Sequence, residues 1–433
     1  MISSPSPLWG GCNTVRLNTC VLLLAAAPWV LRFPALYWMQ LMPRSRRPAL
    51  TAEALQGFGY LDHFRGLFDH LHRCGTARDR AGKRELFFDQ YAALLLLYFF
   101  SPVLTSLRGV QQATTLQKVQ QRLGVRRTAL GSLSEAAAVF DPALLRPIIA
   151  DLAARAVPVV TGREAEALRG LTAVDGSVLP ALPRMVWALW TDPQHRAAKM
   201  HVHFDVLKAV PCDATVTPAA CSELEQLRAT LQPGRLYVLD RGYAGYWLFR
   251  AILDARSSFV VRVKEDVAYT VAEERPLRAA AQTAGVRRDV VVRRLGTPHH
   301  ADDVRQALRL VWVATGQARA DGTPEVLVLC TDRLDLDAEL VALAYRYRWW
   351  IELFFRWLKC ILGCRHLLSE HRNGVTIQVY VALIASLLIS LWTGHKPTKR
   401  TWEMCCFYFS GWASAAEMGT HIAKLQEKVT DSS

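Results

Sequence analysis

Four polar residues between positions 344 and 363 combine the spacing of one helix face with the chemistry of a phosphate site. Tyr345, Arg348, Glu352 and Lys359 are three, four and seven positions apart in turn, and an α-helix places them within an arc of roughly 60°. A carboxylate can take a hard metal ion while neighbouring cations take phosphate oxygens. The same spacing is also typical of an ordinary surface ion pair, which stabilises a helix by only tenths of a kcal/mol.

The opposite side of this predicted helix is apolar. It carries Leu343, Tyr347, Trp350, Ile351, Phe354, Trp357 and Leu358. An apolar face of that width anchors a helix to a core. We therefore expect one face to pack and the other to present Glu352 between cations.

Two further carboxylates stand in segments with the pattern of strands. Asp175 lies in LTAVDGSVL and Asp240 in RLYVLDRGY, and each is predicted to end its strand. Each also has a simpler interpretation: Asp-Gly is a common turn pair, and Asp240 could form a surface ion pair with Arg241.

The elements that must position these residues fall into three regions. Residues 50–160 show helical periodicity, with a break near Pro142 and with a segment, FFDQYAALLLLYFFSPV, that is apolar on all sides of the helix and that we expect to be buried. From about residue 168 short apolar runs predict a mixed α/β sheet, and the 111 residues between Asp240 and Glu352 contain three further strand patterns, RDVVVRRLG, QALRLVWVATG and PEVLVLCTD. These strands predict a β-rich insertion.

Several other features admit two interpretations. Trp312 in the insertion could stack on an unpaired base, but a core position is the commoner role. His201 with His203, and His299 with His300, favour ordinary packing over metal binding. The apolar run VTIQVYVALIASLLISLW approaches the length of a membrane span, although Gln378 and Ser386 interrupt it.

Composition points to a folded protein with a polyanionic partner. Lys and Arg total 52 against 38 for Asp and Glu, a net charge of +14, while 51% of the residues are hydrophobic. Nucleic acid is the simplest such partner, and a membrane surface would also attract this charge. Basic residues of the helical region, Lys118, Arg122, Arg126 and Arg127, could follow DNA or form a solvated face. The ten cysteines lack a zinc-binding spacing, which indicates reduced thiols.

Residues 1–48 do not share the pattern of the rest. The apolar run from Cys20 to Leu31 is too short to span a bilayer and lacks a convincing cleavage site. A start codon at Met39 or Met42 is the preferred explanation; a genuine signal segment and an ordinary extension are the alternatives. We expect a chain begun at Met42 to behave like the full one.

The spacing of Tyr345, Arg348, Glu352 and Lys359 also resembles a known signature. Tyrosine, two residues, arginine, three residues, glutamate, six residues and lysine is the pattern of bacterial DDE-type transposases of the insertion-sequence-four family, and the segments around Asp175 and Asp240 resemble that family's other two acidic blocks. The resemblance runs from about residue 50 to about 420.

This resemblance implies a fold and a reaction. The fold class would be α/β: a ribonuclease-H-like mixed sheet with flanking helices, a β-rich insertion and an all-helical N-terminal module. Asp175, Asp240 and Glu352 would be the catalytic residues and would hold two magnesium ions, with manganese as a substitute. Such ions activate water and stabilise the leaving oxyanion of a DNA strand. Tyr345, Arg348 and Lys359 would bind DNA at its terminal phosphate.

The implied protein is a cut-and-paste transposase whose DNA strand cleavage and strand transfer both depend on a metal ion. It would bind double-stranded DNA, both the terminal inverted repeats and the target DNA. A second copy of the chain would join it in a homodimer, and no membrane would be a partner. It would act in the bacterial cytoplasm, associated with the nucleoid. An inactive, transposase-derived DNA-binding protein is the alternative, and the presence of all three carboxylates argues against it.

The predicted organisation has six parts. They are an extension at 1–48, a helical DNA end-binding module at 49–160, catalytic core at 161–270, the β-rich insertion at 271–334, the second part of the core at 335–420, and a tail at 421–433.

Overall fold

The computed structural model describes residues 66–74, 83–192, 195–296 and 306–430, all within the compact unit Leu50–Ser433. The predictions for residues 1–48, including the start at Met42, lie outside the described residues. The pair His299 and His300 lies outside them too.

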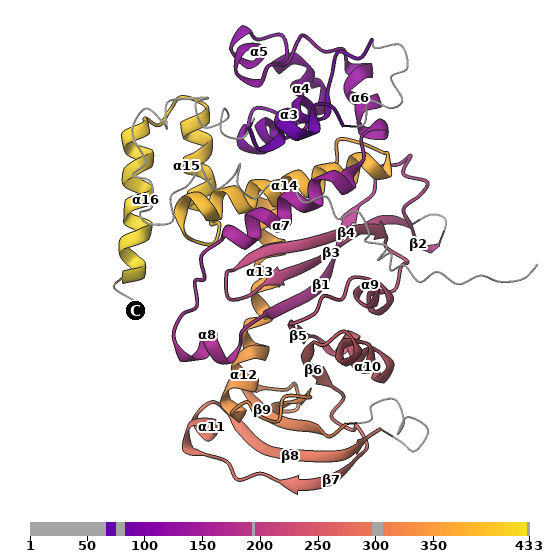
Figure 1. The fold of residues 1–433 in the computed structure, drawn as a ribbon, viewed down its shortest axis with the longest axis vertical. Coiled ribbons are helices and arrows are strands. Elements are labelled where there is room, and N and C mark those ends of the chain that lie inside the picture. The colour runs from indigo at the N-terminus through magenta and orange to yellow at the C-terminus, as the bar shows by residue number, and fades with distance from the viewer. Residues whose placement is uncertain (1–65, 75–82, 193–194, 297–305, 431–433) are drawn as a thin grey trace, which may run out of the picture. The chain divides into compact units, whose positions relative to one another are not determined.

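A helical module precedes the sheet, as the periodicity predicted (Figure 1). Its helices are α3 (Phe88–Phe100), α4 (Leu107–Ala113), α5 (Gln117–Leu123), α6 (Leu130–Val139) and α7 (Arg146–Arg155). The largely apolar α3 is buried along almost its whole length because other helices surround it. The chain leaves α5 through Gly124 in the left-handed conformation (φ 61°), and a short 3-10 turn, Pro142–Leu145, separates α6 from α7. The break predicted near Pro142 is therefore confirmed.

Five strands form the central sheet in the order β4-β3-β1-β5-β6. They are β1 (Leu171–Pro180), β3 (His195–Asp205), β4 (Val210–Pro218), β5 (Leu236–Leu239) and β6 (Ser258–Val263). The first three in sequence pair antiparallel as a meander, and β5 and β6 then run parallel to β1. A three-stranded meander continued by two parallel strands is the ribonuclease-H-like arrangement, so the predicted fold class is confirmed. The strand β4 and the short β2 (Leu189–Asp192) were not predicted.

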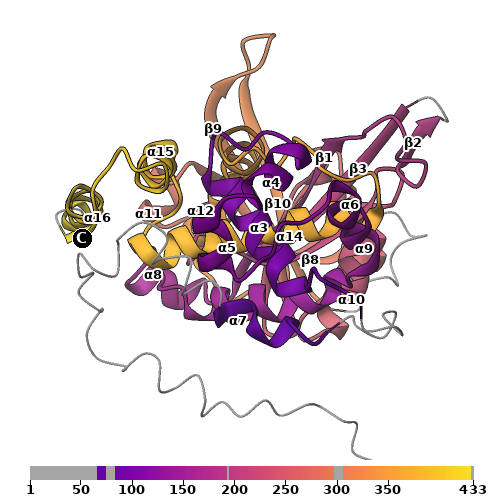
Figure 2. The same ribbon diagram turned by 90° about the horizontal axis from the view of Figure 1, so that it is seen from above.

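The predicted β-rich insertion continues this sheet. Strands β8 (Val286–Leu295), β9 (Leu308–Ala318) and β10 (Pro324–Thr331) match the three predicted patterns, and β7 (Tyr269–Glu274) is an additional edge strand. Because β10 pairs antiparallel with β6, the order runs on as β6-β10-β9-β8-β7. In Figure 2 the β9–β10 hairpin projects beyond the neighbouring ribbon.

A buried ion pair joins this extension to the segment before α12 (Ala338–Tyr347). The Arg309 guanidinium donates to both carboxylate oxygens of Asp289, at 2.7 and 2.6 Å. Its remaining nitrogen donates to the carbonyl oxygens of Arg333 and Leu336. The side chains of Arg309 and Asp289 are only 2% and 4% exposed, so neither charge has water as an alternative partner.

Helices cover both faces of the sheet. Alternate residues of β1 enter separate cores: Ala173 belongs to the core that includes residues of α13 (Trp349–Arg356) and α14 (Arg372–Thr393), and Val174 to the core that includes residues of α10 (Tyr246–Asp254). This division follows from the two-residue period of a strand. The remaining helices are α8 (Arg163–Ala167), α9 (Glu223–Ala229), α11 (Ala279–Thr283), α15 (Lys399–Phe409) and α16 (Ala415–Thr430).

The long helix α14 has the length and apolar composition to cross a membrane, and 89% of its most apolar window is buried inside the protein. It contacts α3, α6, α7 and β4, and in Figure 1 it lies between the helical module and the sheet. Its polar residues are satisfied internally: Gln378 donates to the His366 carbonyl oxygen and accepts from the Leu368 N–H. The apolar run of the sequence is therefore a helix buried inside the protein.

Candidate active site

The polar face predicted from the sequence lies on three consecutive helical pieces. Tyr345 belongs to α12, Glu352 to α13, and Lys359 to a five-residue π-helix, Trp357–Ile361. The prediction of one regular helix over 344–363 was therefore wrong. The backbone hydrogen-bond pattern of the α-helix is interrupted at Arg348. It changes to the wider π-helical pattern further on, where the Leu362 N–H donates to the Trp357 carbonyl oxygen five residues earlier. The predicted apolar face does pack, with Ile351, Phe354, Trp357 and Leu358 buried and Leu343, Tyr347 and Trp350 partly buried against the core.

Asp175 lies inside β1, and the prediction that it ends a strand was wrong. The strand continues to Pro180 because β3 pairs with it as far as Ala197. The Asp-Gly pair is consequently extended backbone and makes no turn. Asp240 does follow its strand directly, as predicted, and its carboxylate accepts from the Gly242 N–H at 2.8 Å.

The parallel pairing of β1 with β5 brings the two aspartates to neighbouring positions. The last paired residues are Ala173 and Val238, and Asp175 and Asp240 each stand two positions further along. An offset of two returns each side chain to the same face of the sheet. That face carries Ala173 and Val238 into the core cluster that includes α13.

Arg348 links Asp175 with Glu352. One guanidinium nitrogen lies 2.6 Å from Glu352 Oε1, and another lies 3.9 Å from Asp175 Oδ2. The guanidinium carbon also lies 5.8 Å from the centre of the Tyr345 ring. The Arg348 side chain is 14% exposed, so this is a partly buried bridge between two acidic groups.

The surroundings make the charged form of Asp175 unfavourable. Burial is the main cause that raises the pKa of this carboxyl from 3.8 to about 6, and the nearby Asp240 and Glu223 carboxylates raise it further. The Gly176 N–H, which donates to Asp175 at 2.7 Å, and the Arg348 guanidinium act in the opposite direction. Burial therefore outweighs the hydrogen bond from Gly176 and the attraction to Arg348 in setting the pKa of Asp175.

Two residues beside Asp175 were missed by the sequence reasoning. Glu223, the first residue of α9, lies 2.9 Å from Lys199 Nζ. The buried Tyr243 lies three positions after Asp240, and burial together with the nearby carboxylates of Glu223, Asp175 and Asp240 raises the pKa of its hydroxyl well above the ordinary value. The glycine after Asp175 is the one signal in the sequence, because it leaves room for Glu223.

Lys359 stands apart from the other members of the polar face. Its side chain is half-buried, and no ion pair of Lys359 occurs within the described part of the chain. Contacts therefore join Tyr345, Arg348 and Glu352, while Lys359 remains a cation without a carboxylate partner there.

The carboxylates fit a hard divalent cation in their chemistry. They supply oxygen ligands, and the Asp175 carboxyl stands near the Asp240 and Glu223 carboxylates. In this conformation no three acidic, histidine or cysteine side chains of the described residues are close enough to hold one ion.

The other candidates behave as packing residues. His201 pairs with Thr217 and His203 with Thr230 through their Nε2 atoms, at 2.8 and 3.0 Å. Trp312 is half-buried, and the Arg288 guanidinium lies 5.2 Å from its ring centre. The eight cysteines that the structure describes are all free thiols.

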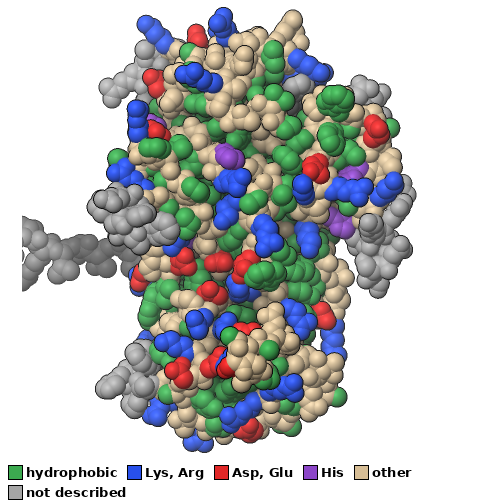
Figure 3. Space-filling view, turned by 180° about the vertical axis from the view of Figure 1, so that it is seen from behind, with side chains coloured by type: hydrophobic (Ala, Val, Ile, Leu, Met, Phe, Trp, Pro, Cys, Tyr) green, Lys and Arg blue, Asp and Glu red, His purple; other side chains and the backbone are tan. Residues whose placement is uncertain are grey.

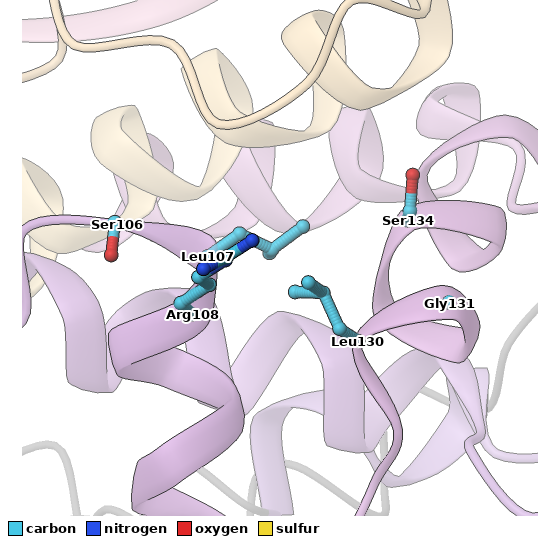
Figure 4. A pocket seen from close by; sticks show the side chains of 6 residues that line it. All are labelled: Ser106, Leu107, Arg108, Leu130, Gly131 and Ser134. Atoms are coloured by element: carbon cyan, nitrogen blue, oxygen red, sulfur yellow. The ribbon is translucent and has the colours of Figure 1, made fainter.

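The surface of the helical module carries exposed cations and one open hollow. Lys118, Arg122, Arg126 and Arg127 are exposed, which suits both a solvated face and contact with DNA. On the face drawn in Figure 3, basic side chains are spread over the whole height among acidic ones. The hollow in Figure 4 is lined by Ser106, Leu107, Arg108, Leu130, Gly131 and Ser134. It holds no carboxylate and is separate from the acidic site.

Comparison with known proteins now identifies the family. The family model described as "Transposase DDE domain" matches residues 166–388, which include Asp175, Asp240 and Glu352. The chain belongs to the transposase DDE domain family. The predicted kinship with DDE-type transposases is thereby confirmed.

Two relatives have names that agree with this assignment. "Putative transposase y4zB" of Sinorhizobium fredii is 30% identical over 232 residues, 53% of this chain and 62% of the relative. "Probable transposase for insertion sequence element IS5377" of Geobacillus stearothermophilus is 24% identical over 218 residues, 50% of this chain and 55% of the relative. The matched region thus spans less than two thirds of each relative.

A solved structure of the piggyBac transposase synaptic complex with hairpin DNA aligns with a TM-score of 0.40 and 10% identity. The alignment covers 88% of this chain and 86% of that one.

Proposed function

We propose that this DDE-domain protein is a cut-and-paste transposase that cleaves the ends of its own insertion sequence and joins them to target DNA. The observation that carries the proposal is the grouping of Asp175 and Asp240 on one sheet face, with Glu352 linked to Asp175 through Arg348. A site of this composition needs no side-chain nucleophile, because water attacks the phosphodiester.

In the proposed mechanism, Asp175, Asp240 and Glu352 are the catalytic carboxylates and hold magnesium, or manganese in its place. The bound ions would supply an activated water and stabilise the leaving oxygen. Asp175 lies on β1 and Asp240 directly follows β5, so two adjacent strands hold both carboxylates in place. Glu352 comes from a helix and becomes available when Arg348 leaves it.

Tyr345, Arg348 and Lys359 would bind the terminal phosphate of the element end. Arg348 can exchange the Glu352 carboxylate for a phosphate, since a guanidinium binds both in the same two-pronged geometry. Lys359 adds a second positive charge, and the Tyr345 hydroxyl adds a hydrogen-bond donor. DNA binding would in this way release Glu352 for the metal and couple the two events.

The proposed partners are the terminal inverted repeats, target DNA and a second copy of the chain. The exposed cations of the helical module, with a net charge of +14 for the whole chain, supply the sequence-independent part of DNA affinity. The proposed site of action is the bacterial cytoplasm, on the chromosome.

Purified protein, magnesium and DNA carrying the flanking element ends test this function. We expect strand cleavage that leaves a 3′-hydroxyl and that stops when EDTA removes the metal. The variants Asp240→Asn and Glu352→Gln should lose cleavage but still bind the element ends. A wild-type protein that binds the ends but never cuts them, with either metal, would support the inactive DNA-binding alternative.

The phosphate-binding roles need a separate comparison. Arg348→Ala and Lys359→Ala should weaken end binding with the fold intact, measured by gel shift and by thermal unfolding. Arg346→Ala is the matched control, because Arg346 carries the same charge on α12 but is exposed. Equal losses in all three variants would show a general charge effect and no phosphate site.

A further inference from the structure

The strand next to Asp240 carries an arginine at the neighbouring position. The parallel register pairs Leu239 of β5 with Val261 of β6. The next residues of the two chains are therefore Asp240 and Arg262. Val260, two positions before Arg262, belongs to the core that includes residues of α13, and an offset of two returns to the same face of a strand. Arg262 thus lies on the face of the sheet that carries the two aspartates.

Arg262 is also close to the polar residues of α12. Burial is the main cause that raises the pKa of the Tyr345 hydroxyl, while the charges of Arg348 and Arg262 act to lower it. The Asp240 carboxylate acts on the same hydroxyl in the opposite direction. Because the interaction between charges falls with distance, the Tyr345 hydroxyl lies near two guanidinium groups, one from the helical segment and one from β6.

The ion pair that Arg262 makes is long and partly exposed. A guanidinium nitrogen lies 3.8 Å from Glu325 Oε1 of β10, and the two side chains are 28% and 29% exposed. This distance exceeds that of a hydrogen bond, and a pair of this kind contributes little to stability. The other carboxylate oxygen of Glu325 accepts from the Thr315 hydroxyl at 2.9 Å, so Glu325 keeps a partner on β9 when Arg262 leaves it.

A DNA phosphate suits Arg262 better than this carboxylate does, because one guanidinium can donate two parallel hydrogen bonds to phosphate oxygens. We propose that Arg262 is a further phosphate-binding residue, which holds the DNA backbone from the β6 side of the site while Arg348 holds it from the helical side. A phosphate that approaches the Tyr345 hydroxyl meets both guanidinium groups. The inference rests on the proposed function, because it assumes that a DNA end enters the site of the two aspartates.

The test is the affinity of the full chain for duplex DNA carrying the element end, measured by fluorescence anisotropy in magnesium at several KCl concentrations. All proteins carry Glu352→Gln, which should keep the DNA uncut. We expect Arg262→Gln to weaken binding about tenfold. It should also lower the slope of log affinity against log salt by about one, the signature of one lost phosphate contact. A residue that only packs would leave this slope unchanged.

Two variants separate this role from a general effect of charge or of packing. Arg250→Gln is the matched control, because Arg250 also makes a long ion pair, 3.7 Å from Asp254, on α10. That helix packs on the opposite face of the sheet, so the affinity and the slope should not change. We expect Glu325→Gln to bind the element end more tightly, because it removes the carboxylate that competes for Arg262. A purely structural ion pair predicts that Glu325→Gln and Arg262→Gln are equally impaired.

The outcomes distinguish this inference from the proposed function. If Arg262→Gln has the affinity and the salt slope of Arg250→Gln, the inference is wrong, and DNA cleavage by the unmodified chain still supports the function. If the unmodified chain never cuts but Arg262→Gln lowers the slope, the phosphate contact stands and the proposed reaction is wrong. Should Arg262→Gln fail to fold, Glu325→Gln decides the question: tighter binding supports the inference, and unchanged or weaker binding overturns it.

Discussion

Asp175→Asn should stabilise the free protein at neutral pH while removing a carboxylate that the proposed reaction requires. Burial and the neighbouring acids raise the pKa of Asp175 from 3.8 to about 6. Each pH unit corresponds to about 1.4 kcal/mol, so keeping this side chain ionised in the folded state costs about 3 kcal/mol. The side chain is only 20% exposed, so water screens little of this cost. Asparagine has the same shape and carries no charge.

The sign of the pH dependence follows from the raised pKa. Between about pH 4 and pH 6 the folded protein binds more protons at Asp175 than the unfolded chain does, so this group lowers the free energy of unfolding as the pH rises. The cost is absent below the unfolded pKa of 3.8 and complete above about 6. Wild type and Asp175→Asn should therefore differ at neutral pH and converge near pH 4.

Urea unfolding in EDTA, at about pH 7.5 and about pH 4.5, measures this difference. Asp254→Asn is the control, because Asp254 is 72% exposed at the end of α10, and a surface change of this kind moves stability by about 0.5 kcal/mol or less. Two results would refute the reasoning. In the first, the Asp175→Asn protein is less stable than wild type at pH 7.5; in the second, it is more stable than wild type by the same amount at both pH values. The first result would mean that attraction to Arg348 outweighs the burial.

Two further predictions concern stability. Arg309→Ala should lower the free energy of unfolding by about 3–5 kcal/mol, because it leaves the buried Asp289 charge without a partner; urea unfolding measures this, and the double change Arg309→Met with Asp289→Leu should recover most of the loss. Gly374→Ala should destabilise the protein by about 1–3 kcal/mol because its Cβ would lie 2.3 Å from Ser369 Oγ and 2.7 Å from the Ala137 Cβ. A thermal melt measures the second effect, and an unchanged melting temperature would show that α14 and α6 can separate freely there.

Local sequence patterns determined the kinds of element and most of their positions. The helical period predicted α3, α6 and α7, and alternating or continuous apolar runs predicted β1, β5 and the strands of the extension. These signals are local, because the period of a helix or strand appears within a few residues. The spacing around Glu352 also predicted the relation to DDE-type transposases that the family match confirms.

The same local patterns misplaced details that depend on neighbours distant in the chain. The continuation of β1 past Asp175 depends on its pairing with β3, and the π-helix at Trp357–Ile361 depends on the core that buries Trp357 and Leu358. A fixed angle of about 100° per residue cannot anticipate either one.

The tertiary structure alone decided which charged groups meet. The register of β1 against β5 places Asp175 beside Asp240, and Arg348 then bridges to Glu352 across a sheet–helix contact. Glu223 joins them from a helix 48 positions after Asp175 in the sequence, through the gap at Gly176. The strength of an electrostatic interaction depends on the distance between the charges and on their burial, and long-range packing sets both. The sequence therefore showed the types of residue, but it could not show their distances or their pKa values.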